Sequence, residues 1–153
     1  MREILFRGKR IDNGEWVCSG NLIHFNEGDQ HFIANLNDKC ITTHDENDHI
    51  IAIEDTRIYK VIPETVGQYT GLTDKNGKKI FEGDIVKTER DLWHGENKKE
   101  REVFVSVVRY DEKQCSFGLY GRYKFLALRR FKGDFNEVIG NIHDNPELLK
   151  GGG

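Results

Sequence analysis

Short apolar runs separated by polar turns dominate the first third of the chain. The pair Asn13-Gly14 stands between two such runs. This is the strongest short hairpin signal, because a type I′ turn needs positive φ at both of its central residues. We therefore expect a tight turn at Asn13-Gly14. The pattern predicts short strands over residues 3–7, 20–25 and 31–34, with the turn at Asn13-Gly14 between two apolar segments of 11–17, followed by a polar loop over 35–49.

The same alternation of short apolar runs and turns continues to the end of the chain. Pro63, one of two prolines, lacks a backbone donor and tends to end strands, so we expect a domain junction near residues 62–64. Short strands with Gly and Asn turns favour a small antiparallel barrel or roll over a parallel sheet. The predicted domains are an N-terminal β region, 1–62, and a C-terminal β barrel, 63–150. Further strands are predicted over 50–53, 57–61, 66–70, 79–81, 84–89, 101–110, 115–120, 123–128 and 136–142.

Helix signals are sparse. The best is Asp144-Asn145-Pro146-Glu147-Leu148-Leu149, in which Asn145 suits an N-cap and Pro146 suits the first helical position. This segment predicts one or two helical turns in a mainly β protein.

Composition identifies a folded, polar chain. At 153 residues it can bury about 68 to 70% of the surface that it exposes when unfolded. Nine Phe, five Tyr and two Trp argue against disorder. The net charge of -3 is too small to indicate a dominant nucleic-acid or membrane field.

The cellular setting follows from two further features. The chain has no apolar run of membrane-spanning length, and its first residues lack the apolar core of a secretory signal. Cys18, Cys40 and Cys115 are widely spaced and form no CxxC pair, which suits free thiols in a reducing compartment. We expect a cytoplasmic protein that is not bound to a membrane.

The glycine-rich stretch at residues 65–87 resembles a phosphate-binding loop only superficially. Gly71 and Gly77 are separated by five residues instead of four, Lys79 replaces the hydroxyl residue after Lys78, and no helical pattern follows. A hairpin turn at Asn76-Gly77, flanked by solvated lysines, is the better interpretation.

An acidic pair follows that stretch. Glu82 and Asp84 flank Gly83, and we expect both carboxylates to be exposed. Such a pair can bind a metal or act as general acid and base, but turn chemistry is the favoured interpretation.

Potential metal ligands cluster between residues 40 and 49. Cys40, His44 and His49 lie there with several carboxylates, and zinc and nucleophilic catalysis both use such groups. The spacing matches no closed tetrahedral set, and a fourth ligand would have to come from His24 or His31. A polar surface loop is favoured, and no metal or cofactor is expected.

The most distinctive charge feature is the basic and aromatic segment 120–132. Strand alternation would place Arg122 and Lys124 on one face, and Tyr123 and Phe125 on the other, towards the core. Binding of single-stranded nucleic acid would instead require exposed aromatic rings beside the cations. The candidate binding residues here are Arg122, Tyr123, Lys124, Arg129 and Arg130.

Residues 88–102 are rich in charge, and Leu92 and Trp93 are their large apolar side chains. We expect a long loop or an extended hairpin. Trp93 is a further candidate binding residue, because tryptophan is enriched at binding hot spots, although packing on its own domain is an equal alternative.

Three segments together resemble the YopX family of phage and prophage proteins. They are FRGKRIDNGEWVCSGNLI at 6–23, VIPETVGQYTGLTDKNGKKIFEGDIVK at 61–87 and EVIGNIHDNPELL at 137–149. The resemblance implies a β region followed by an SH3-like barrel or roll, in a bacterial host or phage setting. It implies no catalytic residues.

Three functions remain open after these observations, and the least favoured is an enzyme that uses Cys40, His44 and the nearby carboxylates. The favoured hypothesis is a non-enzymatic accessory protein that binds a host or phage protein, alone or as a homo-oligomer. The alternative is nucleic-acid binding through the segment 120–132. A fold of this kind hosts both kinds of binding, so the fold alone does not decide between them.

Overall fold

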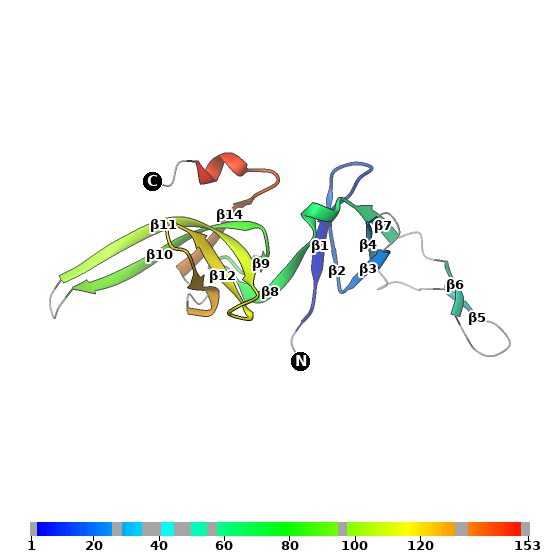
Figure 1. Cartoon of the computed structure of the whole chain (residues 1–153), viewed down its shortest axis with the longest axis horizontal. Coiled ribbons are helices and arrows are strands. Elements are labelled where there is room, and N and C mark those ends of the chain that lie inside the picture. Colours follow the sequence, from blue (N-terminus) through cyan, green and yellow to red (C-terminus); the bar gives the residue numbers. More distant parts are fainter. Residues whose placement is uncertain are drawn as a thin grey trace. The chain divides into compact units, whose positions relative to one another are not determined.

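The structure is a computed structural model that describes residues 3–25, 29–34, 41–44, 50–54, 58–94, 98–130 and 135–150. It is mainly β, with antiparallel sheets, and the helical elements of the described residues are short 3-10 turns (Figure 1). The predicted mainly β fold is confirmed. No helix in these ranges is long and apolar enough to cross a membrane.

The chain divides into two compact units, residues 3–68 and 69–153. Residues 62–64, where we expected a junction, belong to the first unit. The 3-10 helix η1 (Pro63–Thr65) is fastened there, because Ile62 donates its N–H to the Lys9 carbonyl and Lys9 donates its own to Thr65 Oγ1. Pro63 therefore follows the end of β7 (Ile58–Val61), but the chain remains part of the N-terminal unit as far as Gln68.

The N-terminal unit has a small core of Ile33, Ala34 and Val61, all almost fully buried. Gly8 lies against Val61 so closely that an added Cβ would meet it at 3.0 Å. One sheet contains β2 (Trp16–Ser19), β1 (Phe6–Lys9) and the start of β8 (Gly67–Thr73). A second has the order β3 (Asn21–Phe25), β4 (Gln30–Ala34) and β7 (Ile58–Val61), and β5 (Ile41–His44) pairs with β6 (Ile50–Glu54).

The β1–β2 hairpin lies where Asn13-Gly14 predicted one, but its turn is longer than expected. Lys9 pairs with Trp16, Arg10 donates to the Glu15 carbonyl, and Gly14 alone has positive φ, at 73°. The type I′ prediction is therefore wrong. The Asn13 side chain accepts the Glu15 N–H, which stabilises the wider turn without a left-handed residue at 13.

The C-terminal unit is built on a five-stranded antiparallel sheet that curls into a half-barrel (Figure 1). Its core cluster consists of Ile80, Val86, Phe104, Val108, Leu119 and Leu128. The SH3-like topology that the resemblance implies stays a prediction. The strand order is β13 (Leu126–Ala127), β12 (Ser116–Gly121), β11 (Lys98–Asp111), β10 (Asp84–His94) and β14 (Asn136–Asn141), and β9 (Lys79–Phe81) pairs with β8.

Two segments of this unit settle expectations from the sequence. Residues 88–94 and 98–102 belong to an extended hairpin, because β10 and β11 pair continuously from Ile85–Val107 to His94–Lys98. The strand predicted over 123–128 is wrong: residues 122–124 form a bend, and β13 has two residues. This bend is stabilised by side-chain contacts of Tyr123, described below, and not by pairing with a neighbouring strand.

The predicted helical turn at Pro146 is present as the 3-10 helix η4 (Pro146–Leu149), but Asn145 makes no side-chain cap. Its Oδ1 faces back towards β14 and accepts the Asn141 N–H at 3.4 Å. An added Cβ on Gly140 would lie 2.6 Å from this oxygen, so the side chain occupies space that glycine leaves.

A buried carboxylate connects the glycine-rich stretch to the last strand. Asp74, 4% exposed, accepts the N–H groups of Asn76 and Lys78 through Oδ1 and that of Val138 through Oδ2. Gly77 takes positive φ, at 79°, as a three-residue hairpin with a bulge requires. The predicted hairpin turn is confirmed.

We predict that Asp74→Asn lowers the unfolding free energy of the C-terminal unit by about 1 to 3 kcal/mol, because one carboxylate oxygen becomes an amide that cannot accept a backbone N–H. Hydrogen exchange of the β14 amides during urea titration measures the change. The exposed Glu147→Gln is the matched control, expected to stay within about 0.5 kcal/mol. Equal stability of the two variants would contradict the assigned role.

The acid stability of this unit should depend on the same group. Burial opposes ionisation of Asp74, but the N–H groups of Val138, Lys78 and Asn76 outweigh it, and the pKa is lowered from 3.8. The folded unit therefore binds fewer protons here than the unfolded chain, so the stabilisation is complete above about pH 5 and is lost as the pH falls through the lowered pKa. We expect the stability difference between wild type and Asp74→Asn to shrink in urea titrations as the pH is lowered below about 4. A difference that stays constant through this range would show that the charge of Asp74 is not responsible.

Candidate interaction groove

An open groove of about 500 Å³ lies on the face of the C-terminal sheet. It is formed by one face of β11, the end of β12, the bend that follows and the helix η4. We call it the β11 groove. Its lining residues are Val105, Val107, Arg109, Tyr120, Gly121, Arg122, Tyr123, Lys124 and Leu149.

Strand alternation produces the apolar floor of the groove. Val105 and Val107 lie two residues apart on β11 and therefore point to the same face, while Phe104 and Val108 point to the core. The helix η4 packs against β11 and brings Leu149, 38% exposed, to this floor. Val107 is only 4% exposed, so Val105 and Leu149 supply the partly exposed aliphatic surface of the groove.

The rim of the groove is positively charged. Arg109 continues the Val105 and Val107 face of β11, and its guanidinium lies 6.0 Å from the centre of the Tyr120 ring. Arg122 and Lys124 come from the bend, and both are exposed. The lining residues include these three cations and no carboxylate, so the potential inside the groove favours an anionic partner.

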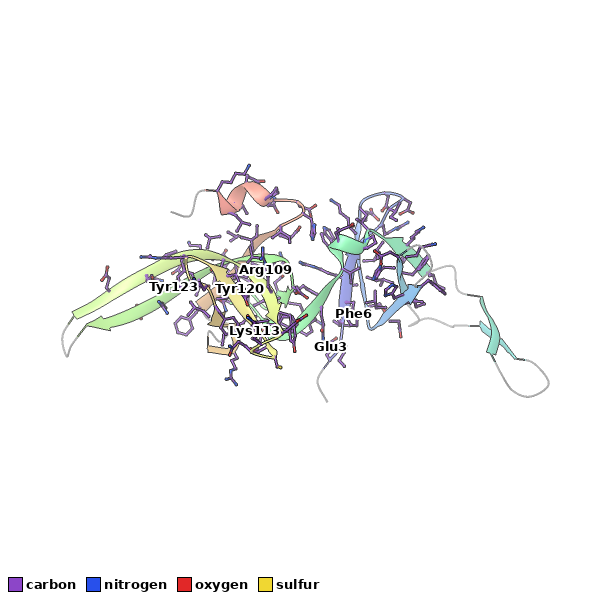
Figure 2. The ribbon with its side chains drawn as sticks, in the orientation of Figure 1. Glu3, Phe6, Arg109, Lys113, Tyr120 and Tyr123 are labelled. Atoms are coloured by element: carbon purple, nitrogen blue, oxygen red, sulfur yellow. The ribbon has the colours of Figure 1, made fainter. Side chains whose placement is uncertain are left out.

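Tyr120 forms a polar wall beside Arg109 (Figure 2). Its hydroxyl donates a hydrogen bond to Asp111. Burial, together with this bond, raises the pKa of Tyr120 to about 12. The side chain therefore stays a neutral donor at physiological pH, and Asp111 fixes its orientation.

Tyr123 holds the bend against the sheet. Its hydroxyl donates to Glu102 Oε1 at 2.5 Å and accepts from Arg90 Nη2 at 2.8 Å, while Arg90 Nε donates to Glu102 Oε2 at 2.5 Å. The pKa of Glu102 is lowered, and the hydrogen bond from Tyr123 is the largest cause. Burial acts in the opposite direction, and the hydrogen bond and charge of Arg90 lower the pKa further. This three-residue network keeps a carboxylate ionised below the bend.

Both aromatic rings of the bend are engaged inside the unit. Tyr123 packs edge-on against Phe104, with ring centres 5.5 Å apart. Phe125 covers Gly118, where an added Cβ would lie 2.2 Å from the ring, and meets Tyr120 at 5.8 Å. These packed rings are not the exposed stacking platform that single-stranded nucleic acid requires.

The structure brings together part of the predicted site. Arg122, Tyr123 and Lys124 line the groove, whereas Arg129, in η2 (Leu128–Arg130), is exposed but is not a lining residue. The side chains of Arg130 and Trp93 lie outside the described residues. The backbone of Trp93 pairs with Lys99 in the hairpin of β10 and β11.

Sequence reasoning missed the contribution of β11. The alternation of Val105, Val107 and Arg109 was available as a signal, since it places two aliphatic residues and a cation on one face. Leu149 had no such signal, because its place depends on how η4 packs. The missed residues connect the basic bend to an apolar surface.

Among the other candidates from the sequence, the acidic pair does not form a site. The expectation that Asp84 is exposed is wrong: it is 1% exposed, and its Oδ2 accepts the Phe81 N–H at 2.8 Å. Glu82 accepts the Tyr110 N–H, so turn and strand contacts account for the acidic pair. The side chains of Cys40, His44 and His49 lie outside the described residues.

Comparison with known proteins gave a family and structural likenesses. The crystal structure of protein EF1440 from Enterococcus faecalis is 22% identical, with a TM-score of 0.49, over 97% of this chain and 99% of that chain. A search of curated proteins found no match. The family model described as YopX protein matches residues 5–150, nearly the whole chain. The chain therefore belongs to the YopX protein family.

Proposed function

We propose that the protein is a non-enzymatic interaction module whose β11 groove binds an acidic segment of another protein. The observation that carries the proposal is the combination of three cations and no carboxylate with an aliphatic floor among the lining residues. A segment with carboxylates flanking one apolar side chain would match both features, because the charges steer association and the buried side chain adds affinity.

The proposal extends the setting that the sequence indicates. We place the protein in the cytoplasm of a bacterial host, as an accessory product of a phage or prophage, and its partner among host or phage proteins. A second copy of the chain is the alternative protein partner. Trp93, near the end of the hairpin of β10 and β11, stays a candidate for a separate contact.

Nucleic-acid binding is the alternative use of the same cations. The packing of Tyr123 and Phe125 disfavours it, because a single-strand surface combines cations with exposed rings. Arg122 is also held 3.3 Å from Glu102, which reduces the charge that it offers to any anionic partner. An acidic peptide, which needs few charges and one apolar contact, suits the groove better.

Charge reversal in the groove should abolish partner capture. Arg109→Glu with Lys124→Glu changes two rim cations and leaves the Arg122–Glu102 pair intact. We expect protein captured from host-cell lysate by wild type to be lost with this variant. The captured protein, once purified, should bind more weakly as salt rises above about 0.15 M, because exposed charges are screened.

The matched control is Lys78→Glu with Lys113→Glu, which makes the same change in net charge at exposed positions outside the groove lining. It should capture the same protein as wild type. Equal capture by the groove variant and wild type, or no capture above background by wild type, would contradict the proposal.

Gel-shift measurements distinguish nucleic-acid binding from binding of an acidic protein segment. We expect single-stranded DNA and RNA to show no shift with wild type at about 0.15 M salt, because a few exposed cations without stacking rings provide little affinity. A shift that falls steeply with salt and disappears in Arg122→Glu with Arg129→Glu would instead identify a nucleic-acid-binding protein.

A further inference from the structure

The paired strands β3 and β4 belong to the N-terminal unit (Figure 1). Together with the residue that precedes β4, they bring two histidines and a carboxylate together. His24 and His31 are direct cross-strand partners, and their rings stack with centres 4.3 Å apart. Asp29 directly precedes β4 and has a φ of 47°, an uncommon value for a residue other than glycine. Its carboxylate reaches both rings from the turn. We call these three residues the hairpin cluster.

The distances within the hairpin cluster are those of ligands around a small ion. Asp29 Oδ1 lies 3.6 Å from His24 Nε2 and 3.7 Å from His31 Nδ1, and the three candidate ligand atoms lie within 4.8 Å of one another. Ligands about 2.0 to 2.1 Å from a tetrahedral zinc ion are separated by about 3.3 to 3.4 Å. Rotation of the exposed His24 and Asp29 side chains closes this difference while His31 stays in place.

Direct hydrogen bonding does not account for the arrangement. An N–H···O bond joins atoms about 2.7 to 3.2 Å apart, shorter than either contact of Asp29. The carboxylate is therefore near both imidazoles and hydrogen-bonded to neither. An ion between the three groups would satisfy all of them once the exposed His24 ring rotates out of the stack, because a nitrogen lone pair lies in the plane of its ring.

The burial of His31 supplies a second, independent observation. Its side chain is 17% exposed, and its Nδ1 is buried without a hydrogen-bond partner. A buried polar atom is costly unless it is satisfied. His24 and Asp29 are 46% and 75% exposed, so an ion can enter from solvent. The atom that lacks a partner is the one that faces the carboxylate.

The chemistry of the donors limits the kind of ion. Imidazole nitrogens suit zinc, copper and nickel, whereas calcium and magnesium prefer oxygen ligands throughout. We propose that His24, Asp29 and His31 bind a late first-row divalent cation, Zn²⁺ in the first instance, through two nitrogens and one oxygen. Three protein ligands leave one position of a tetrahedral ion for water or an outside ligand.

Calorimetric titration of the full chain with Zn²⁺ tests the proposal. We expect binding of about one equivalent, weakened about tenfold or more in Asp29→Asn and in His24→Gln. Asparagine tolerates the left-handed backbone at position 29, so loss of binding there does not reflect a misfolded turn. His143→Gln, a histidine of the C-terminal unit, is the matched control and should bind as wild type does.

Cobalt absorption excludes the exposed thiols Cys18 and Cys115 as the source of binding. Co²⁺ held by the hairpin cluster should give visible bands of a four-coordinate ion without thiolate charge transfer, and Asp29→Asn should remove them. The proposal is overturned by no Zn²⁺ binding, by binding that both hairpin variants retain, or by a thiolate spectrum. It is independent of the β11 groove, because the cluster belongs to the other unit.

Discussion

The carboxylate of Asp74 organises the C-terminal unit, because it connects segments that the chain separates widely. It completes the turn between β8 and β9 and also accepts the N–H of Val138 in β14. Lys75 donates its backbone N–H to the Asn136 carbonyl, and the buried Asn136 side chain accepts from Thr88 in β10. One local turn thus becomes the attachment point for the last strand of the sheet.

β14 pairs with β10, and β10 pairs on its other side with β11, so the last strand and the groove strand belong to the same sheet. With the sheet curled over its core, alternate residues of β11 have separate roles. Phe104 and Val108 fill the core, while Val107 and Arg109 face the groove. The core residues therefore fix the register of the groove residues, since a slip by one position would exchange the two faces.

Local signals explain which parts of this structure the sequence predicts. The hairpin at Asn76-Gly77 depends on residues that are close together in the chain, so the local sequence pattern is sufficient to predict it. The role of Asp74 is not visible locally, because Val138 lies far along the chain. The bend at Tyr123 is a case in which the local pattern misleads. Alternating cations and aromatic rings predict a strand, but the hydrogen bonds of Tyr123 with Arg90 and Glu102 stabilise a bend.

The hairpin cluster lies between these two cases. His24 and His31 stand at equal distances from the centre of the turn that joins β3 and β4, and residues so placed are cross-strand partners in an antiparallel hairpin. The strand bounds predicted from the sequence, 20–25 and 31–34, would instead pair His24 with Phe32, so the sequence alone did not bring the two imidazoles together. It also could not provide the backbone conformation of Asp29, which turns the carboxylate towards both rings. The strand register places the imidazoles of His24 and His31 side by side, and the conformation of Asp29 adds the carboxylate that makes them a candidate metal site.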